Sequence, residues 1–505
     1  MTYDFIVVGS GPAGSTVASR LARSVHAPKV LLLEAGGRNQ DVKTRVLAER
    51  YSTFRTYPTM NWGYKTIPQE ALGGRELGYD RGKGLGGSSA INFACYTTGP
   101  KDDFDEWARR VGDDAFNWEN ARRRFDKIES YGVDTSKQYQ EYARPSATEH
   151  GAKGPVYVEF AETLEKSMTD VLDAAKDFGW QLNSDVNSGN PLGIGIVPAT
   201  AHKGMRSTAA TAYLADPPSN LTIMTDAPVS KVVFDGEKAI GVVAAGNEYT
   251  ASKEIILSAG ALDSPKILLL SGVGPIEELE KHRIKVVNEL TGVGRNLQDH
   301  YFVPVTVQQK DGTNDRAALF NNPDALQAAK DQFEKDGTGP LAIFYTSIIM
   351  GWICNEDLFE TEEFEALPAA FQEHMRLPTV PSWELITHSP VFSPLADPAR
   401  AYLTPREDII SDFDVPLSAS DEDIWAFVQT HAMSTYHMSC TVKMGKEDDE
   451  MACIDSAFRV RGMKGLRVAD MSVTPFVPNC HVVSIAYQIG EAAAEKLIEE
   501  YGLDA

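Results

Sequence analysis

Short apolar runs separated by a glycine-rich turn open the chain and predict a parallel β-sheet with an intervening helix. Asp4–Val8 and Lys29–Leu33 are nearly continuous apolar segments, as expected for strands buried on both faces of a sheet. Between them, Ser15–Ala22 places Val17 and Leu21 on one face of a helix. Strand, helix and strand form a βαβ unit, so the first 37 residues predict an α/β domain.

The turn between the first strand and this helix carries the pattern Gly-x-Gly-x-x-Gly. Gly9 permits the tight turn, Gly11 lets the backbone approach a pyrophosphate, and Gly14 lets helix and strand pack closely. The helix N-terminus, with Pro12 and Ala13 in the turn, offers free N–H groups and partial positive charge to phosphates. The turn therefore predicts a phosphate-binding site.

The second strand ends on an acid, Glu34, which Ala35 follows. An acid about twenty residues past the last glycine is typical of dinucleotide sites, where it accepts hydrogen bonds from the ribose and disfavours a 2′-phosphate. Glycines alone would also fit an ordinary strand–helix turn. Because both strands, the helix and the acid are present, we assign Glu34 and Ala35 to a dinucleotide site.

A second glycine- and serine-rich stretch, Gly82–Asn92, cannot form a regular element. Such loops let the backbone come very near a flat or charged ligand. A flexible linker is the alternative, but a linker would not run directly into the apolar segment Ala90–Ala94. The stretch therefore predicts a cofactor loop, with Gly82, Gly86 and Ser89 among its binding residues.

The middle of the chain returns to strands and then changes character. Short apolar runs predict strands over Val156–Phe160, Leu221–Met224, Val229–Phe234, Ala239–Ala244 and Glu254–Ser258. Gly260–Pro265 then begins a helix whose N-terminus is expected to point at the cofactor. After Tyr301, the alternation of Val303, Val305 and Val307 predicts antiparallel sheet. We place the substrate domain there. Charged amphipathic segments predict helices over Asp102–Ser130, Leu164–Phe178, Asp324–Phe333 and Glu363–Met375.

The final seventy residues again carry candidate chemistry. A strand over Gly465–Asp470 ends on an acid, and a helix is predicted from Ser484 to about Tyr501, with Ser484 as its N-cap. His437 lies in the block Tyr436–Gly445 before that strand, and His481 lies in Pro478–His481 after it.

Composition narrows the class of protein. Lysine and arginine number 48 against 71 aspartates and glutamates, so the net charge of −23 argues against nucleic acid or an anionic membrane as partner. Five cysteines without CxxC spacing suit a reducing compartment and give no disulfide framework or metal site. No apolar run reaches the roughly 18–20 residues that span a bilayer. We therefore expect a cytoplasmic protein; its oligomeric state is left open.

Four ordered motifs, added to the N-terminal unit, resemble those of the glucose–methanol–choline family of flavin oxidoreductases. They are Gly82–Tyr96, Gly260–Gly274, Gly292–His300 and His437–Gly445. The resemblance is nearly full length and implies FAD as the dinucleotide. It implies a Rossmann-like FAD-binding domain with a discontinuous α+β substrate domain built on an antiparallel sheet. The expected FAD-binding segments are 1–155, 205–300 and 431–505, and the substrate segments are 156–204 and 301–430.

The resemblance also implies residue roles. His437 would be the active-site histidine and His481 its partner, with the helix after His481 pointing its positive end at the flavin. Apart from the resemblance, His300 is expected to cap or pack the loop after Asp299, with substrate contact as the alternative. The expected cofactor contacts are Asn92 and Ala94 near the isoalloxazine, Val229 at the adenine end, Asp470 and Met471 near the phosphates and ribityl chain, and Val482.

Two departures from the family pattern lie beside His437. Cys440 stands where the family usually has glycine and Val442 where it usually has cysteine. The block around Cys440 is similar to choline-dehydrogenase-like and formate-oxidase-like members, whereas Pro475–His481 is closer to aryl-alcohol oxidases. We expect the substitutions to narrow the pocket or to change the backbone beside His437.

These residues predict oxidation of a primary alcohol, aromatic, furanic or similarly neutral, to the aldehyde. Histidine suits proton removal because its pKa lies near 6.5, so His437 is assigned as general base and His481 as the group that binds the substrate oxygen; the reverse assignment is the alternative. Oxygen or another acceptor would complete the cycle. An apolar access funnel is a further hypothesis, with ordinary core packing as its alternative, for Trp62, Phe302, Phe344, Tyr345, Trp352 and Phe392.

Other functions remain open on the same fold. A choline-dehydrogenase-like enzyme is the first alternative, although the sequence shows no clear aromatic cage. A hydroxynitrile lyase, which does no redox chemistry, is the second. A binding-only flavoprotein is disfavoured because both histidines are present, and a disulfide reductase because no redox CxxC is present.

Overall fold

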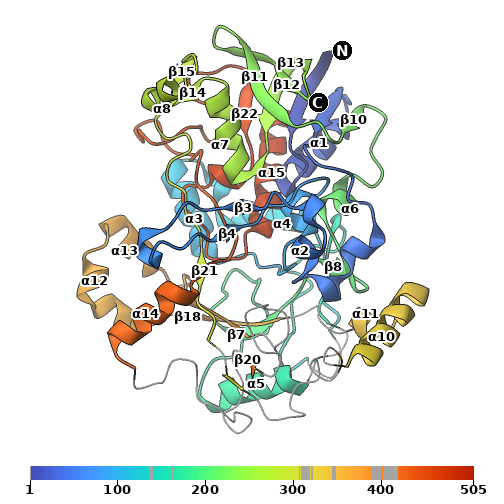
Figure 1. Ribbon diagram of the computed structural model, residues 1–505, viewed down its shortest axis with the longest axis vertical. Helices are drawn as coiled ribbons and strands as arrows, with labels where there is room; N and C mark the ends of the chain where they lie inside the picture. Colours follow the sequence, from blue (N-terminus) through green and yellow to red (C-terminus); the bar gives the residue numbers. More distant parts are fainter. Residues whose placement is uncertain are drawn as a thin grey trace.

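The computed structural model describes residues 2–135, 140–161, 164, 166–305, 307–308, 319, 322–343, 348–387, 400–401 and 419–504. Figure 1 shows a large sheet in the upper half of the molecule and a smaller sheet, flanked by α5 (Lys166–Asp177), in the lower half. Both chain ends lie in the upper half. The molecule therefore has the two-part organisation that the sequence predicts.

The large sheet has seven strands. Its main path runs β10 (Leu221–Met224), β2 (Val30–Leu33), β1 (Thr2–Val8), β13 (Asn247–Leu257), β12 (Lys238–Ala244) and β11 (Val229–Asp235), and β22 (Leu466–Val468) pairs with β13. β10, β2, β1, β13 and β22 are parallel, and β12 and β11 are antiparallel. The centres of β1 and β2 are fully buried, as their continuous apolar sequences predict.

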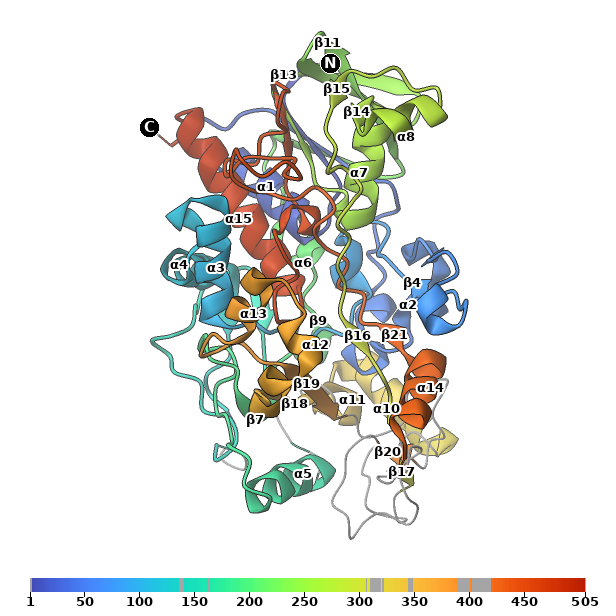
Figure 2. The same ribbon diagram turned by 90° about the vertical axis from the view of Figure 1, so that its left-hand side faces the viewer.

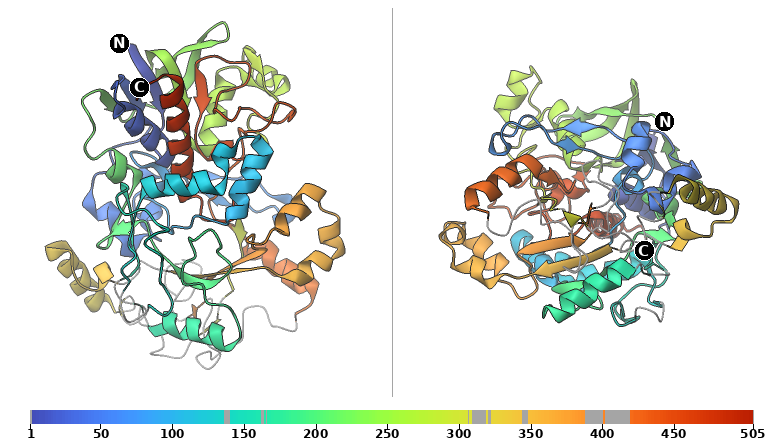
Figure 3. Two further views of the ribbon diagram at one scale, coloured as in Figure 1. Left: turned by 180° about the vertical axis from the view of Figure 1, so that it is seen from behind. Right: turned by 60° about the horizontal axis from the view of Figure 1, so that its bottom comes forward.

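Two helices pack together against one face of this sheet. α1 (Pro12–Ala22) and α15 (Val483–Glu500) lie side by side in Figure 3. A Cβ at Gly490 would lie 2.7 Å from the Ala13 carbonyl oxygen, so only glycine permits this close crossing. Figure 2 shows α4 (Trp118–Ile128) beside α15, where Arg124 pairs with Glu495 at 2.7 Å.

Ser484 does not cap α15, so that prediction is wrong. The N-cap is Val482, and Ser484 lies inside the first turn. Its buried hydroxyl donates to the Thr97 carbonyl at 2.5 Å instead. This bond fixes the start of α15 to the segment that follows the Gly82–Asn92 loop.

The glycine turn has the geometry that its sequence predicts. Gly9 has a φ of 98°, in the left-handed region, and a Cβ there would lie 2.4 Å from the Ser258 carbonyl oxygen. A Cβ at Gly14 would lie 2.0 Å from the Gly9 carbonyl oxygen. Gly9 therefore makes the tight turn, and Gly14 permits the close packing of α1 on the turn.

Two long helices predicted from amphipathic patterns are each broken. The segment Asp102–Ser130 forms α3 (Lys101–Val111) and α4, because Gly112 ends α3 with a φ of 71°. The segment Glu363–Met375 forms α12 (Glu362–Glu365) and α13 (Ala369–Met375), which Pro368 separates. α10 (Pro323–Asp336) agrees with its prediction. The other α-helices that the described ranges contain are α2 (Thr53–Thr56), α6 (Ala209–Tyr213), α7 (Gly260–Leu270), α8 (Ile276–Lys281), α11 (Pro340–Ile343) and α14 (Asp421–His431).

The lower sheet is antiparallel, as expected. β18 (Ile348–Ile353) lies between β7 (Gly193–Val197) and β19 (Trp383–Thr387). The strand predicted from the valine alternation after Tyr301 is only partly present, because Val303 and Val305 lie outside any strand. Among the described residues of this stretch, β16 (Tyr301–Phe302) and β17 (Val307–Gln308) are the strands, paired with β21 (Met433–Ser434) and β20 (Arg400–Ala401).

The predicted fold class is confirmed, and the exact domain limits stay a prediction. Within the described ranges, no helix combines the length and the apolar character needed to cross a membrane.

Candidate active site

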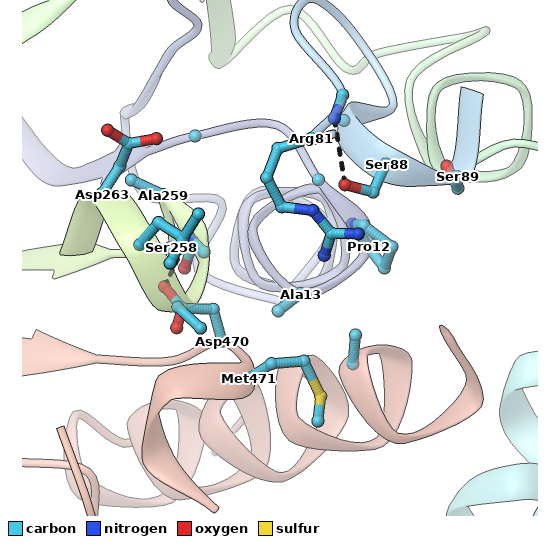
Figure 4. A pocket seen from close by; sticks show the side chains of 18 of the residues that line it. Pro12, Ala13, Arg81, Ser88, Ser89, Ser258, Ala259, Asp263, Asp470 and Met471 are labelled. Carbon is cyan, nitrogen blue, oxygen red and sulfur yellow. Dashed lines mark hydrogen bonds between the residues drawn. The ribbon is translucent and has the colours of Figure 1, made fainter. Parts of the chain in front are cut away.

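A pocket lies at the carboxyl ends of the parallel strands of the large sheet. Val8, Leu33, Ser258 and Asp470, at or just after the ends of β1, β2, β13 and β22, all line it. Figure 4 shows Pro12 and Ala13 near the middle of the view, with Ser258 and Asp263 on one side, Ser88 and Ser89 on the other, and Asp470 and Met471 below. This edge of an open α/β sheet is where nucleotides bind.

Two long helices begin at this pocket without a side-chain cap. Gly11, the N-cap of α1, has no side chain, and the side chain of Val482, the N-cap of α15, accepts no hydrogen bond from the first turn. The free N–H groups of the first turns face a site that attracts negative charge. The start of α7 differs, because the Gly260 N–H donates to Asp470 Oδ2 at 2.9 Å. The pocket therefore offers two uncapped helix ends to an anionic ligand such as a pyrophosphate.

The glycine-serine loop passes close to the first turn. A Cβ at Gly87 would lie 2.7 Å from Gly11 Cα, and a Cβ at Gly82 would lie 2.1 Å from the Gly87 carbonyl oxygen. Most of the predicted cofactor residues line the pocket: Gly9, Gly11, Pro12, Ala13, Glu34, Ala35, Gly82, Ser89, Asn92, Ala94, Val229, Asp470, Met471 and Val482.

Gly14 and Gly86 do not line the pocket. Gly14 serves the packing described above. Gly86 has a φ of 94°, and its N–H donates to the Ser10 carbonyl at 3.0 Å, so it ties the loop to the first turn. Gly86 therefore shapes the loop, and its assignment as a cofactor-binding residue stays a prediction.

Glu34 joins three segments of the site. Its Oε2 accepts from the N–H of Ser10 at 3.0 Å and from the hydroxyl of Ser10 at 2.7 Å. Its Oε1 accepts from the N–H groups of Gly36 at 2.9 Å and Gly84 at 2.8 Å. The buried carboxylate thus holds both glycine loops together, a role beyond the ribose contact that the sequence predicts.

Asp470 connects the end of β22 to α7. Besides the Gly260 N–H, it accepts from the Ser264 hydroxyl at 2.5 Å and from the Ser472 N–H at 2.8 Å. Burial raises the pKa of Asp470, although these hydrogen bonds act in the opposite direction. It orients two pocket-lining segments.

The two predicted catalytic histidines meet at the pocket. The rings of His437 and His481 are 4.9 Å apart between centroids, with an interplanar angle of 84°. The His437 N–H donates to Asp299 Oδ1 at 2.7 Å, and the His481 N–H donates to the Thr97 hydroxyl at 2.7 Å. Both backbones are therefore anchored, and both side chains line the pocket.

A third histidine completes the group. His300 Nδ1 lies 2.9 Å from His437 Nδ1. The sequence predicted that His300 caps or packs its loop, and the structure shows that it also contacts the His437 side chain. Burial, with the neighbouring His481, His300 and Arg81, lowers the pKa of His437 well below its usual value. Burial also lowers the pKa of His300. The lowered pKa favours the neutral form of His437.

Glu384, which the sequence analysis missed, reaches the histidines from β19 in the lower sheet. Its Oε1 lies 3.0 Å from His481 Nε2, and its Oε2 accepts from Trp352 Nε1 at 3.0 Å. Burial acts to raise the pKa of Glu384, but His481 and His300 outweigh it and the pKa is lowered. No motif surrounds Glu384, so only the folded sheet brings it to the site.

Arg81 and a cluster of aromatic side chains were also missed. The Arg81 guanidinium lines the pocket and donates to the Tyr436 carbonyl at 2.6 Å. Phe54, Phe93 and Tyr436 line the pocket with centroids 6.3–6.5 Å apart, so these rings pack on one another.

Of the six aromatic residues in the access-funnel hypothesis, the described ones differ in position, and the funnel itself stays a hypothesis. Trp62 lines the pocket, with Lys83 Nζ 4.7 Å from its ring centroid. Trp352 is buried in the lower sheet, and Phe302 lies partly buried on β16. Phe344, Tyr345 and Phe392 lie outside the described residues.

Cys440 occupies a backbone position that favours glycine. Its φ is 72°, which costs a residue with a side chain about 1–2 kcal/mol. The thiol is buried 3.3 Å from the Thr474 hydroxyl, and Val442 is buried too. Both departures near His437 are thus accommodated as core residues. In the part of the chain that the structure describes, no three His, Cys, Asp or Glu side chains group as metal ligands.

The chain matches a family profile and full-length known proteins. The family profile described as GMC oxidoreductase matches residues 3–302 with its N-terminal part and 397–490 with its C-terminal part. A protein named oxygen-dependent choline dehydrogenase from Pectobacterium carotovorum is 32% identical, over 98% of this chain and 95% of its own length. The protein of that name from Yersinia pseudotuberculosis is 31% identical, over 98% and 94%.

Solved structures share the fold at lower identity. A formate oxidase superposes with a TM-score of 0.86 at 23% identity, over 99% of both chains. A fungal aryl-alcohol oxidase gives 0.86 at 24% identity, again over 99% of both chains. At these identities the likeness concerns the fold.

Proposed function

Because the chain belongs to the GMC oxidoreductase family, we propose that it oxidises a primary alcohol to the aldehyde with His437 as general base. The enzyme acts on CH–OH donors, and FAD is its cofactor. The observation that carries the proposal is the pair of His437 and His481, 4.9 Å apart at the wall of a dinucleotide pocket. Bound FAD supplies the acceptor for the hydride that leaves the alcohol carbon.

The chain's own residues bind the alcohol and move its proton. The neutral His437 takes the hydroxyl proton at Nε2, because its Nδ1 is already bonded to His300. His481 is paired with Glu384 through Nε2; with protons on both ring nitrogens it also donates from Nδ1 to the same oxygen and stabilises the developing negative charge there. The O–H bond breaks and an N–H bond forms on His437. Burial of His437 keeps bulk water from competing for the proton.

We propose a small cationic alcohol of the choline type as substrate. Full-length relatives at 31–32% identity carry the name choline dehydrogenase. The ionised Glu384 at the histidines and the net charge of −23 both favour a cation. A neutral aryl alcohol is the second candidate, since Glu384 is already paired with His481 and Phe54, Phe93 and Tyr436 offer apolar lining.

An anaerobic alcohol panel, read by flavin absorbance, tests the proposal. Choline should bleach the flavin faster than benzyl alcohol does at equal concentration, and admitting air should then restore the colour with release of hydrogen peroxide. Faster bleaching by benzyl alcohol would favour the second candidate. No bleaching by any alcohol would contradict the proposal and leave the hydroxynitrile lyase.

Oxygen as acceptor and a cytoplasmic location are part of the same proposal. The relatives' name includes oxygen dependence, and all five cysteines are free thiols, as in a reducing compartment.

A further inference from the structure

One proton lies between His300 and His437. Their Nδ1 atoms are 2.9 Å apart, which is hydrogen-bond distance, and the rings meet at 83°. A neutral imidazole carries its proton on one nitrogen and accepts at the other. Since burial disfavours the charged form of both rings, one Nδ1 donates and the other accepts.

The two possible arrangements differ in what His437 presents to the pocket. If His300 donates, His437 carries its proton on Nε2 and has no lone pair for the alcohol. If His437 donates from Nδ1, its Nε2 lone pair is free. No described residue hydrogen-bonds His437 Nε2, and the ring lines the pocket.

We infer that His300 is a positioning residue that accepts the Nδ1–H of His437 and so fixes the tautomer in which His437 Nε2 is a base. The inference rests on the proposed function, because only a base needs that lone pair. A hydrogen bond to one nitrogen of a histidine determines which nitrogen is protonated.

The surrounding structure holds this pair rigidly. Asp299 accepts the His437 N–H, and the His300 carbonyl accepts from the Thr435 N–H at 2.9 Å and the Thr435 hydroxyl at 2.8 Å. Asp299 Oδ2 also accepts from the Ser434 hydroxyl at 2.5 Å. Two consecutive residues, Asp299 and His300, therefore bind both the backbone and the ring of His437.

Two substitutions at His300 of similar shape separate tautomer control from simple packing. In His300→Asn, the side-chain oxygen can stand where Nδ1 stands and accept the same proton. In His300→Leu, nothing accepts it, and His437 can adopt either tautomer. His282→Asn, at an exposed position on another surface, controls for loss of a histidine.

The holoenzymes are compared by anaerobic stopped-flow reduction with the alcohol that bleaches the wild type fastest. For His300→Leu, the limiting rate should fall about 10–100-fold, while the half-saturating alcohol concentration changes less than about twofold. His300→Asn should recover the rate to within about threefold of wild type, and His282→Asn should match wild type.

Equal losses in the Asn and Leu variants, or full activity in Leu, would overturn the inference. Visible spectra and melting temperatures of the holoenzymes identify a variant that has lost FAD or its fold. If His437→Ala is impaired while His300→Leu is not, only this inference fails. If no alcohol bleaches the wild type, the proposed function fails with it.

Discussion

The ring of His437 stands edge to face against that of His481, with centroids 4.9 Å apart. The two residues reach this position from different elements: His437 from the loop after β21 and His481 from the turn that leads into α15. The start of α15 brings both the helix N-terminus and His481 to the pocket. α15 is held in this position by its packing on α1. In the proposed mechanism, cofactor binding and proton transfer therefore both depend on the start of α15.

Glu384 should matter although it lies on another sheet. In Glu384→Gln the charge that holds His481 Nε2 is lost, so His481 becomes a weaker and less well-oriented donor. We expect the rate of anaerobic flavin reduction to fall about tenfold or more, within the usual range for residues that orient catalytic groups.

The matched control is Glu365→Gln, an exposed change on α12. Unchanged reduction in Glu384→Gln would show that His481 needs no carboxylate partner.

The pH dependence of flavin reduction reports the state of His437. The pKa of His437 is lowered well below 6.5, chiefly by burial, and the base must be unprotonated. The rate should therefore stay constant as the pH falls from about 9 to 6.5, and decline only at lower pH. A decline that begins above pH 7 would contradict this environment for His437.

A buried histidine that does not line the pocket should make stability depend on pH. The fully buried His150 lies 3.2 Å from Glu129 and 3.1 Å from Asp185, and its ring stacks on Tyr131 at 3.8 Å. Burial opposes its charge, but the two carboxylates prevail and raise the pKa to about 9.

Because the folded pKa exceeds the unfolded value of about 6.5, His150 contributes stability fully below pH 6.5 and loses it as the pH rises through about 9. The melting temperature should fall over this window more steeply in wild type than in His150→Gln, which cannot be charged. Parallel curves for the two proteins would refute the assignment.

The buried ion pair of Arg467 and Glu254 should be essential for stability. Arg467 is fully buried and donates to both carboxylate oxygens of Glu254, at 2.7 and 2.9 Å. Arg467→Met leaves a buried carboxylate without its partner, which costs about 3–5 kcal/mol. The melting temperature of the holoenzyme should drop clearly, whereas Arg459→Met, at a half-exposed position, should have little effect.

The N-terminal half of the site follows from local sequence. The glycines, the apolar strands and Glu34 lie within one βαβ unit, so short-range patterns determine their geometry. His437 and His481 were found through motifs, and the structure brings them together. In contrast, Ser484 is a residue type that often caps helices, but α15 begins earlier, with Val482 as its N-cap, and the sequence pattern does not mark that start.

The site contacts that the sequence did not predict have one physical cause: they join residues that are distant in the chain. Glu384 and Arg81 act through contacts with residues far away in the chain, and His300 contacts His437 across 137 positions. Hydrophobic periodicity and motif spacing do not predict such long-range contacts. The broken helices at Gly112 and Pro368 show a different limit, because amphipathic patterns continue across a break that one residue imposes.

The most direct test of the central claim is anaerobic flavin reduction in His437→Ala. The variant should keep the yellow cofactor, because the turn and helix ends that hold FAD are unchanged, but its limiting rate of reduction should fall by a factor of about 100 or more. Reduction at the wild-type rate would contradict the assignment of His437 as the base.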